Sequence, residues 1–512
     1  MTEPRATAVL WERLRAIETT RLENLFATDP ARVERLSRRL EWPGADGEIG
    51  GMRVDFSKTH LDEEALGVFE ELAAAAGFVE AREALFSGEI VNVTEGRAAT
   101  HGAMRGSGRD VDTEEAGALL ARMRMLVEAI HDEALGPIRH CIHIGIGGSA
   151  LGPALAIDAL TRDLAKVDVH VVSNVDGLAL ERAFAACDPH TTLIAVASKT
   201  FTTIETMTNA ASALAWLEKE GVADPSGRVV ALTAHPEKAV EWGVDETRIL
   251  PFPESVGGRY SLWSSIGFPV ALAIGMPEFE EFLGGAQAMD THFRESNGRN
   301  NTPLLAAFMD QFYTRVRGCQ TRAVFAYDER LALFPDYLQQ LEMESNGKSV
   351  TSAGERVDGP TAPVTWGGVG TDAQHAVFQL LHQGTQVVPV DFIASVAPGD
   401  ALDPAHHRIL LMNCLAQGAA LMAGKSSEEP ARFYPGDRPS TMFLLDDLDP
   451  ATLGALIAFH EHRTFANAVL MGINPFDQFG VELGKTIATQ IGSGEIHMDP
   501  STQALMEALG LA

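Results

Sequence analysis

Apolar residues in the first forty positions recur three or four residues apart, with Glu and Arg between them. One apolar stripe on an otherwise charged segment is the pattern of an amphipathic helix. The chain is therefore predicted to begin with helices. The apolar positions of this stripe are Leu10, Leu14, Ile17, Leu22, Leu25 and Phe26.

From about Arg139 the pattern changes to short apolar runs rich in Ile, Val and Thr, separated by helix-like segments. Continuous apolar runs are typical of strands that are covered on both faces, as in a parallel sheet. The alternation predicts two consecutive α/β units. The predicted strands are His140–Ile146, Val167–Ser173, Thr192–Ala197, Arg228–Thr233, Arg322–Tyr327, Gln386–Ile393 and Thr441–Leu445.

The domain organisation follows from this alternation and from one stretch of turn formers. Glu295–Pro303 consists almost entirely of turn-forming residues, so it is expected to link the two α/β units. A chain of 512 residues is long enough for two or three domains. We predict a mainly helical N-terminal segment packing on the second domain, two α/β domains and a C-terminal helical tail. Their predicted ranges are 1–105, 106–290, 291–485 and 486–512.

Composition and charge narrow the function classes. Hydrophobic residues make up 46% and charged residues 21%, which is ordinary for a globular protein and excludes a disordered or coiled-coil chain. The formal charge of −30 disfavours nucleic acid and anionic membranes as partners, and no apolar run is long enough to span a bilayer. A small anionic substrate remains possible, because a few local cations can override the global field.

Cysteine and histidine spacing indicates a reduced protein without a bound metal. The four cysteines are scattered, and the N-terminus lacks an apolar signal core, so we expect a cytoplasmic protein. No spacing typical of a metal site is present, and we predict no cofactor. His406-His407 and His460-x-His462 are expected to be surface histidines. The cysteines are Cys141, Cys187, Cys319 and Cys414.

A glycine-rich stretch, His143–Gly152, leaves a predicted strand and enters a predicted helix. Gly145, Gly147 and Gly148 permit close backbone approach, and Ser149 is expected to cap the helix. A helix N-terminus of this kind can bind an anion. The spacing matches neither the dinucleotide fingerprint nor a P-loop. A plain strand-to-helix turn fits equally well.

A second strand end carries a cluster of hydroxyl groups. Ser198, Thr200 and Thr203 lie beside the charge of Lys199, where another helix is predicted to begin. Hydroxyls, a cation and helix N–H groups together suit a terminal phosphate. Thr202-x-x-Glu205 has the spacing of a capping box, which accounts for Glu205 but not for the hydroxyl cluster.

Four weaker candidate residues lie in the second half. Glu344 stands just before a turn, and His375 lies in the first turn of a predicted helix that ends at Gly384. Gln478 and Lys485 are seven residues apart, which predicts one face of a helix that begins near Asn474. Taken singly, each residue also fits a solvated surface position.

Together these stretches resemble the glucose-6-phosphate isomerase (phosphoglucose isomerase) family. The matching segments occur in the family's order, and the Gly-Gly-Arg-Tyr-Ser and Asp-Gln-Phe-Gly-Val-Glu-Leu-Gly-Lys strings are highly specific. The segments are Thr94–Arg97, Gly145–Pro153, Ser198–Glu205, Gly257–Trp263, Met343–Lys348 with Gly370–Gly384, and Phe476–Lys485. The resemblance implies an α/β fold of two sugar-isomerase-type doubly wound domains with parallel-sheet cores.

The resemblance also implies a role for each candidate residue. Glu344 matches the base that moves a proton between C2 and C1, and Arg259 matches the arginine that stabilises the enediolate. His375 and Lys485 match the groups that open the sugar ring. The substrate-binding positions are Gly148, Ser149, Ser198, Lys199, Thr200, Thr203 and Gln478.

The implied activity is a metal-independent aldose–ketose isomerisation between D-glucose 6-phosphate and D-fructose 6-phosphate, a step of glycolysis and gluconeogenesis. A positioned carboxylate and a cation suit this chemistry, because the C–H proton is weakly acidic and an oxyanion develops as it leaves. The family further implies a homodimer in which the partner chain donates His375 to each site. One departure from the family pattern, Gly367–Asp372, precedes the helix that bears His375.

Two alternatives remain open at the level of sequence. An isomerase that also accepts mannose 6-phosphate differs by one epimeric hydroxyl, which a small change in the pocket can admit. A noncatalytic sugar-phosphate sensor could use the same phosphate-binding module. The sensor would need the hydroxyl cluster but neither Glu344 nor Arg259, so the presence of both favours an enzyme.

Overall fold

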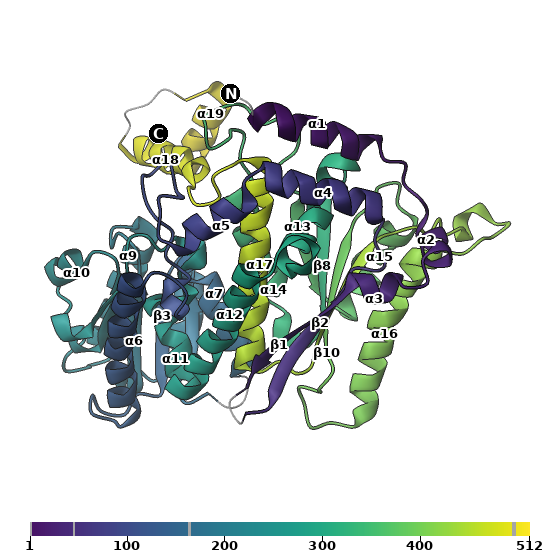
Figure 1. Ribbon diagram of the computed structural model, residues 1–512. Helices are drawn as coiled ribbons and strands as arrows, with labels where there is room; N and C mark the ends of the chain where they lie inside the picture. Colours follow the sequence, from purple (N-terminus) through teal and green to yellow (C-terminus); the bar gives the residue numbers. More distant parts are fainter. Residues whose placement is uncertain (1–2, 45–46, 162–164, 494–497, 512) are drawn as a thin grey trace. The chain divides into compact units, whose positions relative to one another are not determined.

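A five-stranded parallel sheet forms the core of the first α/β unit in the computed structural model (Figure 1). Its strand order is β4-β3-β5-β6-β7, and all neighbouring pairs are parallel. The runs of the three inner strands, β3, β5 and β6, are buried on both faces, as their lack of polar alternation predicts, whereas the edge strand β4 is only partly buried. The strands are β3 (His140–Ile144), β4 (Asp168–Val172), β5 (Thr192–Ala197), β6 (Val229–Thr233) and β7 (Ile249–Pro251).

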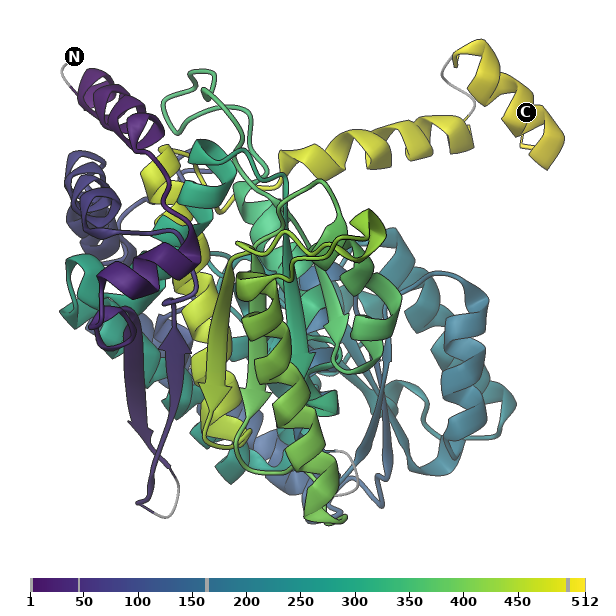
Figure 2. The ribbon, with the colours of Figure 1, turned by 90° about the vertical axis from the view of Figure 1, so that its right-hand side faces the viewer.

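A six-stranded sheet of order β1-β2-β11-β10-β8-β9 forms the core of the second α/β unit. Its four strands from the second half of the chain are parallel, whereas β1 and β2 form an antiparallel hairpin that pairs with β11. Figure 2 shows this hairpin in purple along one edge of the sheet. The strands are β1 (Ser37–Pro43), β2 (Ile49–Asp55), β8 (Thr321–Tyr327), β9 (Val364–Val369), β10 (Val390–Ser395) and β11 (Ser440–Leu445).

The predicted fold class is confirmed, and all seven predicted strands are present: Thr192–Ala197 has the predicted bounds, and the other six have at least one end shifted by one to four residues. The predicted N-terminal helices are present as α1, α2 and α3, but Ser37 already begins β1. Four strands were not predicted from the sequence: β1, β2, β7 and β9. β7 is only three residues long, and β9 contains Gly367-Gly368, which weakens its strand pattern.

Two long helices, α12 (Met276–Glu295) and α17 (Pro450–Met471), cross at close range between the two sheets (Figure 1). A Cβ atom on Gly285 would overlap the carbonyl group of Ala451, and one on Gly454 would overlap that of Phe282. Only glycine permits this approach. Almost every residue of α17 is buried, including His460 and His462. The expectation that these two histidines lie on the surface is therefore wrong.

The structure describes residues 3–44, 47–161, 165–493 and 498–511. The predicted segments 1–105, 106–290 and 486–512 also include positions outside these described ranges. The chain forms two compact units, Met1–Pro475 and Phe476–Ala512. The predicted linker Glu295–Pro303 contains the end of α12, a short 3-10 helix, η8 (Gly298–Asn300), and the start of α13 (Thr302–Gln311). The boundaries at 105, 290 and 485 stay predictions. Within the described ranges, no helix is long and apolar enough to cross a membrane.

The other helices complete the framework. In the first unit they are α1 (Glu3–Ala16), α2 (Leu22–Thr28), α3 (Arg32–Leu36), α4 (Glu63–Ala75), α5 (Phe78–Phe86), α6 (Asp110–His131), α7 (Leu151–Leu160), α8 (Gly177–Ala186), α9 (Ile204–Lys219), α10 (Pro236–Trp242), α11 (Phe268–Ile274), α13 (Thr302–Gln311), α14 (Phe334–Gln339), α15 (Asp372–Gln383) and α16 (Pro404–Ala423). The second unit contains α18 (Glu482–Ser493) and α19 (Pro500–Leu509).

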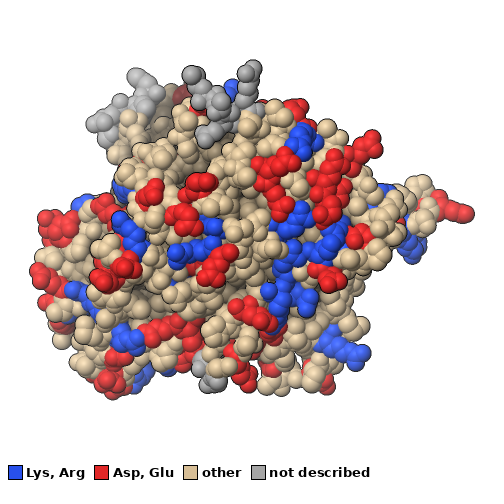
Figure 3. Space-filling view, in the orientation of Figure 1, with Lys and Arg blue, Asp and Glu red and all other residues tan. Residues whose placement is uncertain are grey.

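Acidic and basic side chains are interspersed on the face drawn in Figure 3.

Candidate active site

The glycine-rich turn after β3 packs directly against the segment that carries Arg259. The turn forms a short 3-10 helix, η2 (Gly147–Ser149), and Arg259 lies in a second one, η6 (Gly258–Trp263). A Cβ atom on Gly148 would overlap the Gly258 carbonyl group and lie 2.5 Å from the Arg259 nitrogen. Glycine at this position therefore brings the backbone of Arg259 to the carboxyl end of the first sheet.

Ser149 does not cap the following helix, contrary to expectation. Helix α7 begins at Leu151, its N-cap is Ala150, and no side chain caps it in the described residues. The Ser149 carbonyl oxygen instead accepts a hydrogen bond from His143 Nε2 at 2.7 Å. Burial lowers the pKa of His143 to about 4, so its ring is neutral and serves to hold the turn.

Arg259 and Glu344 form a charge pair in this region. Arg259 Nη1 lies 3.7 Å from Glu344 Oε2, and only 1% of the arginine side chain and 17% of the glutamate side chain are exposed. Arg259 Nε donates to Ser345 Oγ at 2.7 Å, and Nη2 donates to the Pro475 carbonyl oxygen. Glu344 Oε2 is buried and accepts no hydrogen bond from the described residues. A fixed cation thus faces a carboxylate oxygen that retains its basic lone pairs.

Glu344 is the last residue of a π-helical turn, η11 (Gln340–Glu344), which continues α14. Turns of this kind are rare and occur frequently at functional sites. A Cβ atom on Gly147 would lie 3.1 Å from Gln340 Nε2, so the glycine-rich turn also borders η11. Three stretches that are distant in the sequence therefore meet here: Gly145–Pro153, Gly257–Trp263 and Met343–Lys348.

A buried ionic network holds η11 in place through Glu342. Glu342 pairs with Arg322 and accepts a hydrogen bond from Thr365 Oγ1 at 2.7 Å. Burial alone would raise the pKa of Glu342, but the Arg322 guanidinium overrides it and holds this pKa well below the usual range. Glu342 is therefore an ionised structural acid, whereas Glu344, two residues later, lies beside Arg259.

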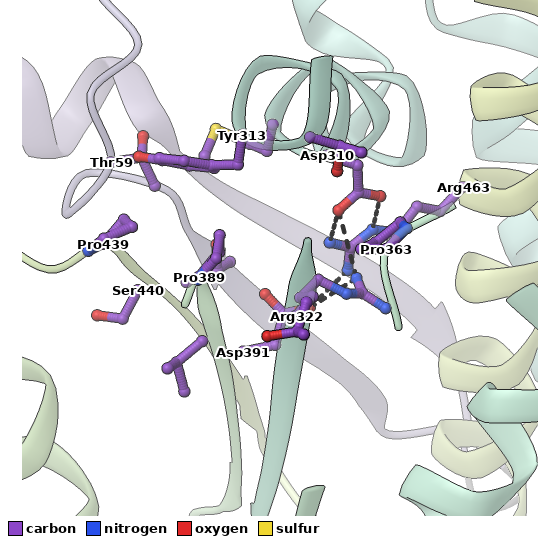
Figure 4. Close-up of a pocket in the computed structure, with 15 residues that line it drawn as sticks. Thr59, Asp310, Tyr313, Arg322, Pro363, Pro389, Asp391, Pro439, Ser440 and Arg463 are labelled. Atoms are coloured by element: carbon purple, nitrogen blue, oxygen red, sulfur yellow. Dashed lines mark hydrogen bonds and ion pairs between the residues drawn. The ribbon is translucent and has the colours of Figure 1, made fainter. Parts of the chain in front are cut away.

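Figure 4 shows the centre of this network, with Arg322 and Arg463 held between two aspartates. Arg463 pairs with Asp310 at 2.6 Å and with Asp391 at 2.7 Å, and Arg322 pairs with Asp391 at 3.0 Å. The adjoining cavity measures about 20 Å³, which is room for about one water molecule. This pocket is too small for a sugar phosphate, so the network supports the fold and does not bind substrate.

The hydroxyl cluster predicted after β5 is present. Ser198 Oγ and Thr203 Oγ1 are 3.1 Å apart, and Thr202 Oγ1 donates to Thr200 Oγ1 at 2.9 Å. The capping box Thr202-x-x-Glu205 does not form, because Thr203 is the N-cap of α9 and makes no side-chain cap hydrogen bond within the described residues. The N-terminus of α9 therefore keeps N–H groups that can bind an anion.

Lys199 links this cluster to the segment that precedes Arg259. Its Nζ donates to the carbonyl oxygens of Glu254 at 2.6 Å and Val256 at 3.1 Å. Burial and the nearby Arg97 guanidinium lower the pKa of Lys199 below its usual value. The predicted phosphate-binding strand end and the Gly257–Trp263 segment are thus neighbours at the same edge of the first sheet.

His375 is exposed on the first turn of α15, as predicted. No hydrogen bond or ion pair in the described part of the chain joins it to Glu344. The helix is held by Tyr327, whose hydroxyl donates to Gln374 Oε1 at 2.6 Å. The structure thus gives His375 access to solvent, and its role stays a prediction.

Gln478 and Lys485 belong to the second compact unit, and both are exposed. The prediction that they share one helix face is wrong, because α18 begins only at Glu482. Gln478 precedes a short 3-10 helix, η13 (Phe479–Val481), whereas Lys485 lies in the first turn of α18.

Sequence reasoning missed the residues that hold the Arg259–Glu344 pair in place. Ser345 is fully buried and contacts both Arg259 Nε and the Tyr260 hydroxyl, the latter at 2.9 Å. At the far end of η6, Trp263 Nε1 donates to Glu461 Oε1 at 2.8 Å. Ser345 and Tyr260 lie in two of the segments that resemble the family and stand next to predicted site residues, whereas nothing in the sequence pointed to Glu461.

Comparison with known proteins gives a consistent result. A family model described as phosphoglucose isomerase matches residues 55–506. The chain is 70% identical over 510 residues to the glucose-6-phosphate isomerase of Erythrobacter litoralis, with 98% of each chain covered. It is 67% identical over 503 residues to that of Novosphingobium aromaticivorans, again with 98% of each covered.

Among solved structures, the glucose-6-phosphate isomerase from Chlamydia trachomatis matches with a TM-score of 0.86 at 28% identity. The match covers 100% of this chain and 99% of that chain, so both sheets and their connecting helices correspond. The chain therefore belongs to the phosphoglucose isomerase family.

Proposed function

We propose that this chain interconverts D-glucose 6-phosphate and D-fructose 6-phosphate by ring opening and proton transfer through a cis-enediol. The observation that carries the proposal is the Arg259–Glu344 pair, 3.7 Å apart beside the glycine-rich turn. Relatives that are 58% to 70% identical are named glucose-6-phosphate isomerase. Mannose 6-phosphate as a second substrate and a noncatalytic sensor are therefore not favoured.

Glu344 acts as the general base in this mechanism. Its carboxylate removes the proton from C2 of the open-chain aldose and returns it to C1, which gives the ketose. The enediolate oxygen becomes negative during this transfer. The Arg259 guanidinium, fixed by Ser345 and the Pro475 carbonyl group, stabilises that charge without first having to reorient.

The substrate phosphate binds at the strand end after β5. The hydroxyls of Ser198, Thr200 and Thr203 and the N-terminus of α9 supply hydrogen-bond donors, and Lys199 supplies a positive charge nearby. The backbone of Gly148 and Ser149 lines the sugar. Binding through these donors requires no metal ion.

His375 and Lys485 complete the proposed machinery by opening the sugar ring, and Gln478 is a further substrate-binding residue. One group donates a proton to the ring oxygen and the other accepts the proton of the anomeric hydroxyl. The exposure of His375 is compatible with its donation to the site of a partner chain in a homodimer. The free, buried thiols of all four cysteines support a reducing, cytoplasmic setting.

The proposal is tested by replacing the base. Glu344→Gln should fold normally and lose about 10²-fold or more in kcat, because an amide cannot accept the C–H proton. Exchange of the C2 hydrogen with deuterated solvent should be lost in parallel. Glu355→Gln, which changes an exposed loop acid, is the matched control. Near-wild-type exchange in Glu344→Gln would remove this residue from the mechanism.

A further inference from the structure

Two histidines and a cysteine converge at the amino-terminal edge of the first sheet. His140 is the first residue of β3, and the pairing of Ile142 with His170 places both histidines on the same face. Cys187 follows the last residue of α8 and belongs to the buried cluster that covers this face. One nitrogen of each ring and the cysteine Sγ all lie within 4.8 Å of one another.

The surroundings of His140 suit metal coordination. His140 Nδ1 is buried and makes no hydrogen bond with the described residues, and its nearest acid is Asp168, whose Oδ2 is 3.9 Å away. The His140 side chain is 20% exposed, so an ion can reach the cluster from solvent.

We propose that His140, His170 and Cys187 form a binding site for a zinc-type divalent cation, with water or Asp168 as the fourth ligand. Two imidazole nitrogens and one sulfur are a donor set that Zn²⁺ prefers, in tetrahedral geometry. Bond lengths of about 2.0 and 2.3 Å place such ligand atoms about 3.5 Å apart, so small side-chain rotations close the site. On binding, the Cys187 S–H bond breaks, its proton passes to solvent, and a sulfur–metal bond forms.

The proposed metal site is distinct from the candidate active site. His140 lies at the amino end of β3, whereas the glycine-rich turn and the hydroxyl cluster follow the carboxyl ends of β3 and β5. A bound ion would tie the end of α8 to β3 and β4. We therefore expect it to stabilise the first α/β unit and to leave the isomerase chemistry unchanged.

Cobalt provides a direct test, because a thiolate–Co²⁺ bond gives an absorption band in the near ultraviolet. The metal-free full-length protein should bind one equivalent of Co²⁺ with this band, and Zn²⁺ should displace it. Cys187→Ser should abolish the band and weaken cobalt binding by at least tenfold. Cys319→Ser is the matched control, because Cys319 is buried to a similar extent as Cys187 and lies outside the cluster.

Two results would overturn the proposal: absence of the band in the wild-type protein, or its persistence in Cys187→Ser. Should Cys187→Ser fail to fold, His170→Gln serves in its place, with His190→Gln as its exposed control. The unfolding midpoint should rise with Zn²⁺ in the wild-type protein and not in the variant. Because neither readout uses isomerase activity, failure of the proposed function would leave this test intact.

Discussion

The close contact between Gly148 and the backbone of Arg259 leads to a prediction about steric overlap. In Gly148→Ala, the new Cβ would start 2.5 Å from the Arg259 nitrogen, whereas ordinary contacts begin near 3.4 Å. The two backbone segments must therefore separate by about 1 Å, and the segment that carries Arg259 is held in buried surroundings from Arg259 to Trp263. Overpacking of this kind costs about 1–3 kcal/mol of stability.

The effect on catalysis should exceed the effect on folding. A displacement of about 1 Å between catalytic groups can cost on the order of 10²-fold in rate, because the reacting atoms leave their attack geometry. Gly148→Ala is therefore expected to lower kcat by about 10²-fold while the protein remains folded at 25 °C. Steady-state kinetics in both directions and thermal unfolding measure the two effects separately.

Gly258→Ala provides the control for this reasoning. A Cβ atom on Gly258 would meet no atom within 4 Å, although this residue is the one that Gly148 contacts. Its unfolding midpoint should stay at or above that of the wild-type protein. Wild-type kcat in Gly148→Ala would refute the argument that this contact positions Arg259. A stability loss in Gly258→Ala equal to that in Gly148→Ala would refute the steric account.

The remaining predictions concern the ionic network, the assembly and the reaction. Glu342→Gln should cost about 1.5–3 kcal/mol of stability at neutral pH, because Arg322 loses the hydrogen bonds of one carboxylate but keeps its pairing with Asp391. The folded-state pKa of Glu342 is lowered, so the stability that this carboxylate contributes is present above its ordinary pKa and is lost as pH falls through the folded-state pKa. The unfolding midpoint, measured down to pH 3, should therefore fall less steeply with pH in the variant than in the wild-type protein. Mixing inactive Glu344→Gln and His375→Ala chains should recover roughly a quarter of wild-type activity if His375 acts across a two-fold interface, and none if it acts within its own chain. Isomerase activity should survive exhaustive chelation, and a loss that Mg²⁺ or Mn²⁺ restores would contradict proton transfer without a metal.

The strands that sequence reasoning found and those it missed differ in how they are buried. Runs such as Thr192–Ala197 are apolar throughout because both faces of a parallel sheet are covered. In β1, Leu40 and Trp42 point inward while Arg39 and Glu41 face solvent, and this short alternation is easily taken for helix. Which strand pairs with which depends on contacts distant in the sequence, as between β2 and β11.

The candidate site also depends on contacts between segments that are distant in the sequence, which local sequence does not reveal. The resemblance to a known family singled out Glu344 and Arg259, and the structure brings them together. Nothing in the local sequence separates Glu344 from Glu342, two residues earlier, although one faces Arg259 and the other is sealed in an ionic network. His460 and His462 were misplaced for a related reason, because α17 is enclosed on all sides by elements from the rest of the chain.

The pairing of β2 with β11 has a consequence for synthesis on the ribosome. Asp55 pairs with Met442, so the partner strand emerges long after the hairpin has left the exit tunnel. At roughly 5–20 residues per second, the hairpin waits on the order of 20–80 s with an open edge. Open edges invite wrong pairing, and charged side chains oppose it. The exposed Arg39, Glu41 and Arg53 on this hairpin thus protect the nascent chain until its last strand arrives.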